Sequence, residues 1–262
     1  MEQEKCARFR FGLLVTGITE KEHLPKLFQG IAPNHICSFV VIDDPIFTEE
    51  NPVLGQRNPR GEKRKAKMVG RGDDIPKKDL EEIGFPARRY LTANPCHFVL
   101  LIDDLEHNRQ RQAQEVFNRY RQAFDAALKE EQQRRASVHF LVNMLEAYYF
   151  ADAKALNATL AIAPLQADYD GDVEMIRNPK GYLRGLLPSF NEIVDGGKVL
   201  SLINVEHILS NPDTCAGLRT LFAWCVKVIK LNPDYQDLIP PERYCLNGGV
   251  LSDLTKAQLD NF

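Results

Sequence analysis

The stretch HFVLLIDDLE, residues 97–106, decides the fold class, because an apolar run of strand length ends abruptly in acidic residues. Three other stretches have a similar length and are rich in β-branched and aromatic residues. These are Arg8–Val15, Ile36–Ile42 and Ser137–Val142. Nearly unbroken apolar runs are typical of parallel strands that are buried on both faces. We therefore predict four strands, the third of which ends at Ile102.

Helical patterns separate these strands. Gly17 and the segment Thr19–Glu22 predict a tight turn and a capping box, and residues 77–92 and 109–135 predict two further helices. The fold class expected is α/β, an open, mainly parallel four-stranded sheet flanked by helices. Beyond residue 152 the pattern is mainly helical, with segments near 152–160, 179–187, 198–209 and 213–230, and Trp224 is expected in a core.

The chain thus divides into an α/β domain over residues 1–152, with an insertion at about 45–76, and a mainly helical subdomain over residues 153–262. The net charge of −3 excludes a protein that is basic overall. No apolar run approaches the roughly 20 residues of a membrane span, and the first residues lack the apolar core of a signal peptide. We expect a cytoplasmic protein without a membrane partner, and leave a homo-oligomer open.

The spacing of the cysteines also favours a cytoplasmic location. The six cysteines are widely scattered and form no C-x-x-C pair, so we interpret all of them as reduced thiols. They are Cys6, Cys37, Cys96, Cys215, Cys225 and Cys245.

The insertion is strongly basic and rich in Gly and Pro. Two interpretations stay open, a solvated loop without function and a loop that binds backbone phosphates. In the second, the residues that contact nucleic acid are Arg57, Arg60, Lys63, Arg64, Lys65, Lys67 and Arg71, joined by Lys180 from the helical half.

Acidic residues follow each predicted strand, where ligands of an open parallel sheet bind. They are Glu20, Asp43 with Asp44, Asp103 with Asp104 and Glu106, and Glu146. Carboxylates that converge from several strands suit Mg²⁺ or Mn²⁺, which needs about six oxygen ligands.

Structural alternatives exist for some of these acids. Glu20 could favour a helix N-terminus, Glu146 could form a capping box with Asn143, and Asp43 with Asp44 could form a turn. Asp103 and Asp104 favour function, since adjacent carboxylates repel each other unless a cation or hydrogen-bond donors compensate.

Several other site classes are excluded by spacing. The histidines form no H-E-x-x-H pair, and the chain contains neither G-x-x-x-x-G-K-[ST] nor G-x-G-x-x-G nor G-x-S-x-G. Asp168–Glu174 lacks the glycine position and the twelfth-position acid of a calcium loop.

Three segments together resemble a known family. Residues 15–20, VTGITE, are similar to the E-G-x-T-E segment that opens TOPRIM domains, and residues 100–106 to their second acidic motif. Residues 145–152, LEAYYFAD, resemble an E-A/F-x-x-F-x-D segment of a TOPRIM-like bacterial family, domain of unknown function 4276. This family is related to the TOPRIM domains of overcoming-lysogenization-defect nucleases.

The resemblance implies Mg²⁺- or Mn²⁺-dependent phosphodiester chemistry. Carried over, the catalytic residues are Glu20, Asp103, Asp104 and Glu146, and Glu106 joins them as a metal ligand. Thr16 stands where the motif has its first glutamate, and Leu105 where the second acid of a D-x-D pair would stand.

Three functions follow as hypotheses. The leading one is a nuclease or nuclease-related effector that acts on DNA or RNA, in a bacterial anti-phage defence system. The second is a catalytically degenerate TOPRIM subunit that serves as partner of a separate ATPase, which Thr16 favours. A third is a nucleotide-binding or phosphotransfer domain of flavodoxin-like shape.

Overall fold

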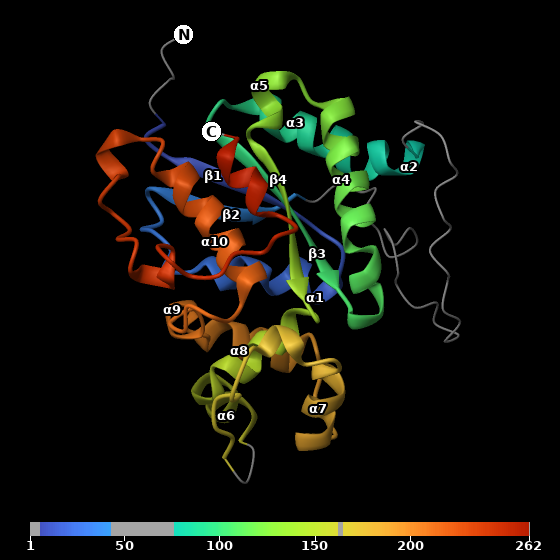
Figure 1. Ribbon diagram of the computed structural model, residues 1–262, viewed down its shortest axis with the longest axis vertical. Helices are drawn as coiled ribbons and strands as arrows, with labels where there is room; N and C mark the ends of the chain where they lie inside the picture. The colour runs from blue at the N-terminus through green and yellow to red at the C-terminus, as the bar shows by residue number, and fades with distance from the viewer. Residues whose placement is uncertain (1–5, 43–75, 162–164, 262) are drawn as a thin grey trace.

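The computed structural model describes residues 6–42, 76–161 and 165–261, and within them one sheet organises the molecule. Its four strands are β1 (Phe9–Val15), β2 (Cys37–Val41), β3 (His97–Leu105) and β4 (Ala136–Val142). They lie in the order β2-β1-β3-β4, and every neighbouring pair is parallel (Figure 1). The predicted α/β class with an open parallel sheet is confirmed.

One face of the sheet is covered by α3 (Phe85–Ala93) and α4 (Ala113–Ala127). Tyr120 and Phe124 of α4 are fully buried among the side chains of Val99, Leu101 and Val138. The apolar stripe of α4 recurs at helical spacing, which is why this helix packs on the sheet. A short α2 (Lys77–Asp79) and a π-helical turn (Leu80–Gly84) lead into α3.

The opposite face is covered by α10 (Ala216–Ile229) and by the 3₁₀ helix η1 (Leu24–Phe28), which continues directly from α1 (Ile18–His23). Trp224 of α10 is buried edge-on against Phe11 and Phe98, with ring centroids 6.3 and 6.2 Å away. The prediction that Trp224 belongs to a core is confirmed. Since α10 comes from the C-terminal half, the same hydrophobic core joins both halves of the chain.

A lobe of short helices lies beyond the carboxyl ends of the strands (Figure 1). It contains the 3₁₀ helix η5 (Leu145–Ala151), the 3₁₀ turn η6 (Val173–Met175) and four α-helices. The α-helices are α6 (Ala153–Leu160), α7 (Pro179–Leu186), α8 (Val194–Leu202) and α9 (Val205–Ile208). This lobe forms the far wall of any site at that edge of the sheet.

The last part of the chain contains three 3₁₀ turns, η7 (Pro233–Tyr235), η8 (Arg243–Cys245) and η9 (Lys256–Asp260). The side-chain amide of Gln258 in η9 bonds the edge strand β4. It donates to the carbonyl of Val138 at 2.8 Å and accepts from the amide of Val138 at 2.9 Å. These are the bonds that a neighbouring strand would make there.

Three local predictions were wrong. The third strand continues to Leu105, because Asp103–Leu105 pair in register with Phe140–Val142 of β4. The long helix over 109–135 is three elements, the 3₁₀ helix η4 (His107–Gln112), α4 and α5 (Glu130–Gln133). Gly17, without a side chain that could bond, is the N-cap of α1 in place of the predicted Thr19 capping box.

The cysteine prediction was also wrong in part. Cys6 and Cys96 form a disulfide, whereas Cys37, Cys215, Cys225 and Cys245 are free thiols. The two bonded residues precede the adjacent strands β1 and β3, so the sheet brings them together across 90 residues of sequence. Spacing along the chain could not reveal this pair.

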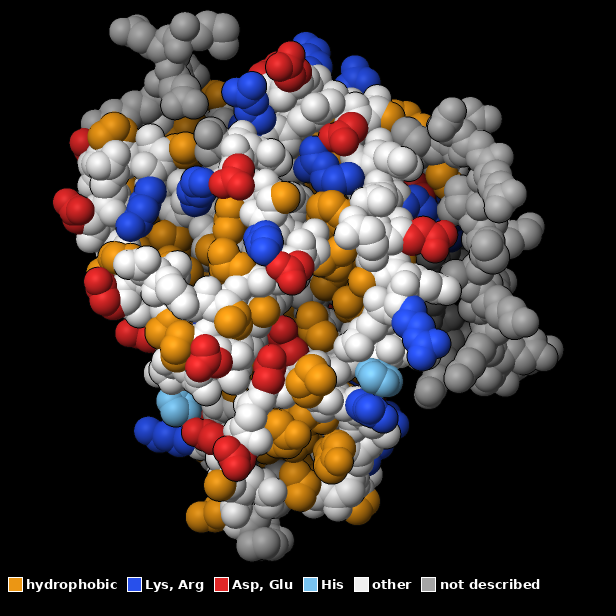
Figure 2. All heavy atoms as spheres, in the orientation of Figure 1, with side chains coloured by type: hydrophobic (Ala, Val, Ile, Leu, Met, Phe, Trp, Pro, Cys, Tyr) orange, Lys and Arg blue, Asp and Glu red, His pale blue; other side chains and the backbone are white. Residues whose placement is uncertain are grey.

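The surface agrees with a small net charge. Basic and acidic side chains are interspersed over the face that Figure 2 shows. Within the described ranges, no helix combines the length and the apolar character needed to span a membrane. The cytoplasmic location and the homo-oligomer stay predictions.

Candidate functional site: carboxylates at the carboxyl edge of the sheet

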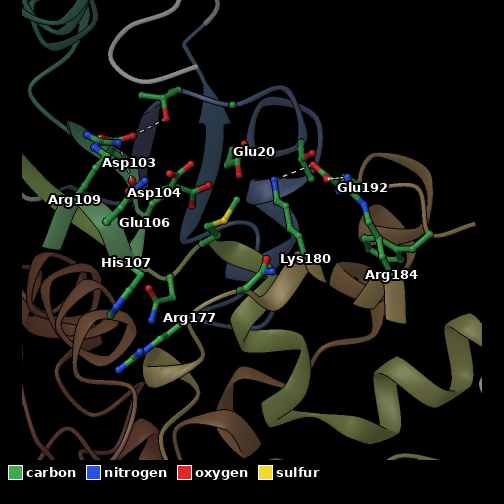
Figure 3. Close-up of a pocket in the computed structure, with 18 of the residues that line it drawn as sticks. Glu20, Asp103, Asp104, Glu106, His107, Arg109, Arg177, Lys180, Arg184 and Glu192 are labelled. Carbon is green, nitrogen blue, oxygen red and sulfur yellow. Dashed lines mark hydrogen bonds and ion pairs between the residues drawn. The ribbon is translucent and has the colours of Figure 1, made fainter. Parts of the chain in front are cut away.

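A cavity of about 910 Å³ opens between the carboxyl ends of β1, β3 and β4 and the lobe of short helices. Its walls come from the β1–α1 turn, the β3–η4 turn, the β4–η5 turn, α7 and the segment 190–193. Five predicted site residues line it, namely Glu20, Asp103, Asp104, Glu106 and Lys180 (Figure 3). Glu146 lies buried beside it, in contact with Lys180.

Asp103 and Asp104 point to opposite faces of the sheet, because successive side chains of a strand alternate. Asp103 faces α4, where the hydroxyl of Tyr120 donates to its Oδ2 at 2.8 Å. Its other contacts are Thr16, whose hydroxyl donates to Oδ1 at 2.8 Å, and Arg109, whose Nη2 donates to Oδ2 at 3.2 Å. Both oxygens of this buried carboxylate are therefore occupied by donors.

Asp104 faces the other way, toward Glu20 and Glu146. Burial raises the pKa of Asp104 well above its usual value, and the charges of Glu20 and Glu146 raise it further. Burial likewise raises the pKa of Glu20 and raises that of Glu146 to about 7. These three carboxyl groups, drawn from α1, β3 and η5, form what we call the carboxylate cluster.

The position of Glu20 depends on Gly17. A Cβ added at Gly17 would lie 1.7 Å from Glu20 Oε2, so the carboxylate folds back over the glycine. Glu20 does lie in the first turn of α1, as the helix-dipole alternative required. Its side chain also lines the cavity, where its charge acts on Asp104.

Asn143 does not cap the helix of Glu146, so the capping-box alternative was wrong. Its backbone φ is +56°, and its side-chain amide donates to the carbonyl of Glu174 at 2.6 Å. Met144, with φ of +79°, is the N-cap of η5 and makes no side-chain cap. The turn that directs Glu146 inward therefore contains two residues with positive φ, a backbone conformation that residues other than glycine rarely adopt.

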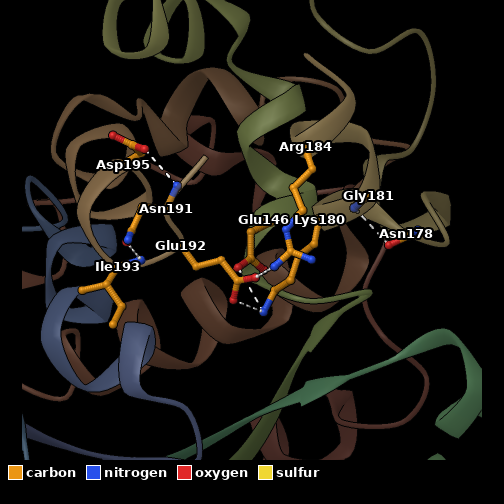
Figure 4. A network of polar contacts seen from close by, with 9 residues as sticks. All are labelled: Glu146, Asn178, Lys180, Gly181, Arg184, Asn191, Glu192, Ile193 and Asp195. Carbon is orange, nitrogen blue, oxygen red and sulfur yellow. Dashed lines mark hydrogen bonds and ion pairs between the residues drawn. The ribbon is translucent and has the colours of Figure 1, made fainter. Parts of the chain in front are cut away.

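Lys180 is the cation at this cluster. Its Nζ lies 3.3 Å from Glu146 Oε1 and 2.8 Å from Glu192 Oε2. Arg184, one turn later on α7, binds the second oxygen of Glu192 at 2.7 Å (Figure 4). Although burial lowers it, the pKa of Lys180 is raised overall by Glu146 and Glu192.

Two buried oxygens of the cluster lack a hydrogen-bond donor. They are Asp104 Oδ1 and Glu146 Oε2, and the hydroxyl of Tyr149, whose pKa burial and the same carboxylates raise, is also unpartnered. Buried oxygens without partners are costly, so these atoms suit a bound cation. As the side chains lie, however, no group of three or more His, Cys, Asp or Glu residues within the described ranges is arranged to hold a metal.

The rim of the cavity carries exposed polar groups. His107 and Arg177 line it, and no ion pair of either is seen among the described residues (Figure 3). Glu106, half-buried, lies on the same rim. The other predicted basic residues, at 57–71, and Asp43 with Asp44 lie outside the described residues.

Sequence reasoning missed several residues that decide the geometry. Thr16, Arg109 and Tyr120 bind Asp103, while Glu192 binds both Arg184 and Lys180. Only the i, i+4 spacing of Lys180 and Arg184 signalled a shared helix face. Glu192 lies in an irregular segment, where no periodicity marks it.

The sequence matches one family profile over most of its length. The profile of the family described as Domain of unknown function (DUF4276) matches residues 15–220. This range includes the whole carboxylate cluster and Lys180. Searches among curated proteins and among solved structures gave no match. Because the family profile covers well over half of its length, the chain belongs to the DUF4276 family.

Proposed function

We propose that this protein is a TOPRIM-like nuclease or nuclease-related effector, which hydrolyses phosphodiester bonds of DNA or RNA with Mg²⁺ or Mn²⁺, in a bacterial defence system. The observation that carries the proposal is the carboxylate cluster, with two buried oxygens that lack donors, at the edge where parallel sheets bind ligands. The likeness of residues 15–20, 100–106 and 145–152 to TOPRIM segments supports it.

The chemistry of the donor set, three carboxylates, suits a hard divalent ion, which would require these side chains to move closer together than they lie here. Glu20, Asp104 and Glu146 would hold it, and the ion would supply polarisation of a phosphoryl oxygen and a more acidic bound water. Asp103 acts as a positioning residue, since its oxygens bind Thr16, Arg109 and Tyr120. His107 and Arg177 at the rim bind backbone phosphates of the substrate strand.

The test is cleavage of plasmid DNA and of RNA by purified protein with Mn²⁺ or Mg²⁺. We expect nicking or degradation that chelation stops and that Asp104→Asn or Glu146→Gln reduces at least 100-fold. Glu115→Gln, on an exposed position of α4, is the matched control and should cleave like the wild type. Equal cleavage by wild type and both site variants would contradict the proposal.

A second candidate is the degenerate subunit that partners a separate ATPase. Thr16 stands in place of the motif glutamate and is committed to Asp103, while Arg109 and Lys180 neutralise Asp103 and Glu146. Two experiments distinguish the candidates. In calorimetry the degenerate subunit would bind no Mn²⁺, and in purification it would be recovered together with an ATPase.

A further inference from the structure

Lys180 lies where the charge of a metal ion would be needed. Its ammonium contacts Glu146, and its charge also acts on Glu20 and Asp104, lowering the pKa of each against the effect of burial. Only about a quarter of the side chain is exposed. One cation from α7 thus serves all three members of the carboxylate cluster.

The backbone position of Lys180 is fixed by the capped start of α7. Pro179 opens α7, and the side chain of Asn178 accepts from the amide of Gly181 at 3.0 Å, which caps the helix (Figure 4). The flexible part is the four-carbon stem, which lets the ammonium move without displacement of the helix.

Glu192 offers the ammonium a second position. This carboxylate already lies closer to Nζ than Glu146 does, at 2.8 Å against 3.3 Å. Its segment is anchored, since Asn191 donates its amide to Asp195 at 2.9 Å and accepts from the amide of Ile193 at 3.0 Å. Arg184 holds the other oxygen of Glu192.

We propose that Lys180 is a positioning residue that substitutes for the divalent cation in the metal-free protein and transfers fully to Glu192 when the ion binds. This inference rests on the proposed function. The ammonium contacts Glu146 Oε1, an oxygen that the ion would bind, and competes with the ion for the charges of the carboxylate cluster. Like charges in one buried cluster exclude each other.

The test is calorimetric titration of the full chain with Mn²⁺ alone, in the absence of nucleic acid. Lys180→Met removes the competitor, so we expect Mn²⁺ affinity to rise at least tenfold. Glu192→Gln removes the second position, so we expect affinity to fall at least threefold. The charge-matched controls are Lys256→Met and Glu206→Gln, whose ion pairs with Asp253 and Arg243 lie outside the cavity, and both should bind like the wild type.

The outcomes separate the two proposals. If the wild type binds Mn²⁺, both shifts are required, and an unchanged affinity in either variant overturns the inference while the metal site stands. Binding by Lys180→Met alone would support competition and refute a metal-loaded wild type. No binding by any variant would overturn both. Circular dichroism checks folding, and if Lys180→Met does not fold, Glu192→Gln decides alone.

Discussion

At the scale of single residues, Asp103 and Asp104 are consecutive in the chain but have different surroundings. They are adjacent in sequence, yet Asp103 is held by three donors and Asp104 has a buried oxygen with none. The sequence indicated that this pair is significant, because adjacent acids at a strand end repel each other. It could not assign the roles, since that depends on which face each side chain meets.

Gly17 allows a sharp test at this scale. Gly17→Ala places a methyl group where Glu20 Oε2 lies, and the backbone φ of −106° accepts alanine, so the carboxylate must move while the fold persists. We expect Mn²⁺ affinity to fall at least tenfold with little change in melting temperature. Gly185→Ala is the control, because a Cβ there meets nothing within 4 Å. Wild-type affinity in Gly17→Ala would refute this account of Glu20.

At the scale of elements, the site depends on strand β3 being three residues longer than expected. The extension carries both aspartates alongside β4, and Asp103 then ties β3 to the β1–α1 turn, to η4 and to α4. Apolar periodicity revealed the strands, but charged residues hide a strand end whose backbone is still paired. Apolar periodicity likewise did not predict the turn before η5, where two residues with positive φ direct Glu146 inward.

The two aspartates should therefore differ in stability effects. Asp103→Asn removes the buried negative charge that pairs with Arg109 and accepts hydrogen bonds from the hydroxyls of Thr16 and Tyr120. The free energy of unfolding should therefore fall by about 3 kcal/mol. Asp104→Asn removes like-charge repulsion within the carboxylate cluster and should cost less than about 1 kcal/mol. Urea denaturation of both variants without metal measures the difference, and the reverse order would show that the roles are exchanged.

At the scale of the whole molecule, the sequence sufficed for the parallel α/β sheet, its flanking helices and the core position of Trp224. These features follow from patterns of neighbouring residues. The disulfide, the Lys180–Glu192 pair and the contacts of Asp103 could not be predicted, because each joins segments that only the folded sheet brings together. The four predicted catalytic acids thus lie at one edge, but only three face each other.

The Cys6–Cys96 bond gives a prediction for the entire chain. It closes a loop of 90 residues, so it should restrict the unfolded state and stabilise the fold by roughly 4 kcal/mol. Unfolding in urea should shift to lower denaturant when dithiothreitol is present. The double variant Cys6→Ser, Cys96→Ser should start at the reduced value and be insensitive to the reductant, whereas a reductant effect that persists in it would implicate other cysteines.

The amide of Gln258 has a consequence for how the protein behaves among its own copies. By satisfying both backbone groups of Val138, the side chain of Gln258 takes the place of a neighbouring strand at one residue of the β4 edge. An open β-edge invites pairing with a second molecule, which leads to fibres or precipitates. The turn η9 thereby blocks β-pairing at this point of the β4 edge, away from the cavity at the carboxyl ends of the strands.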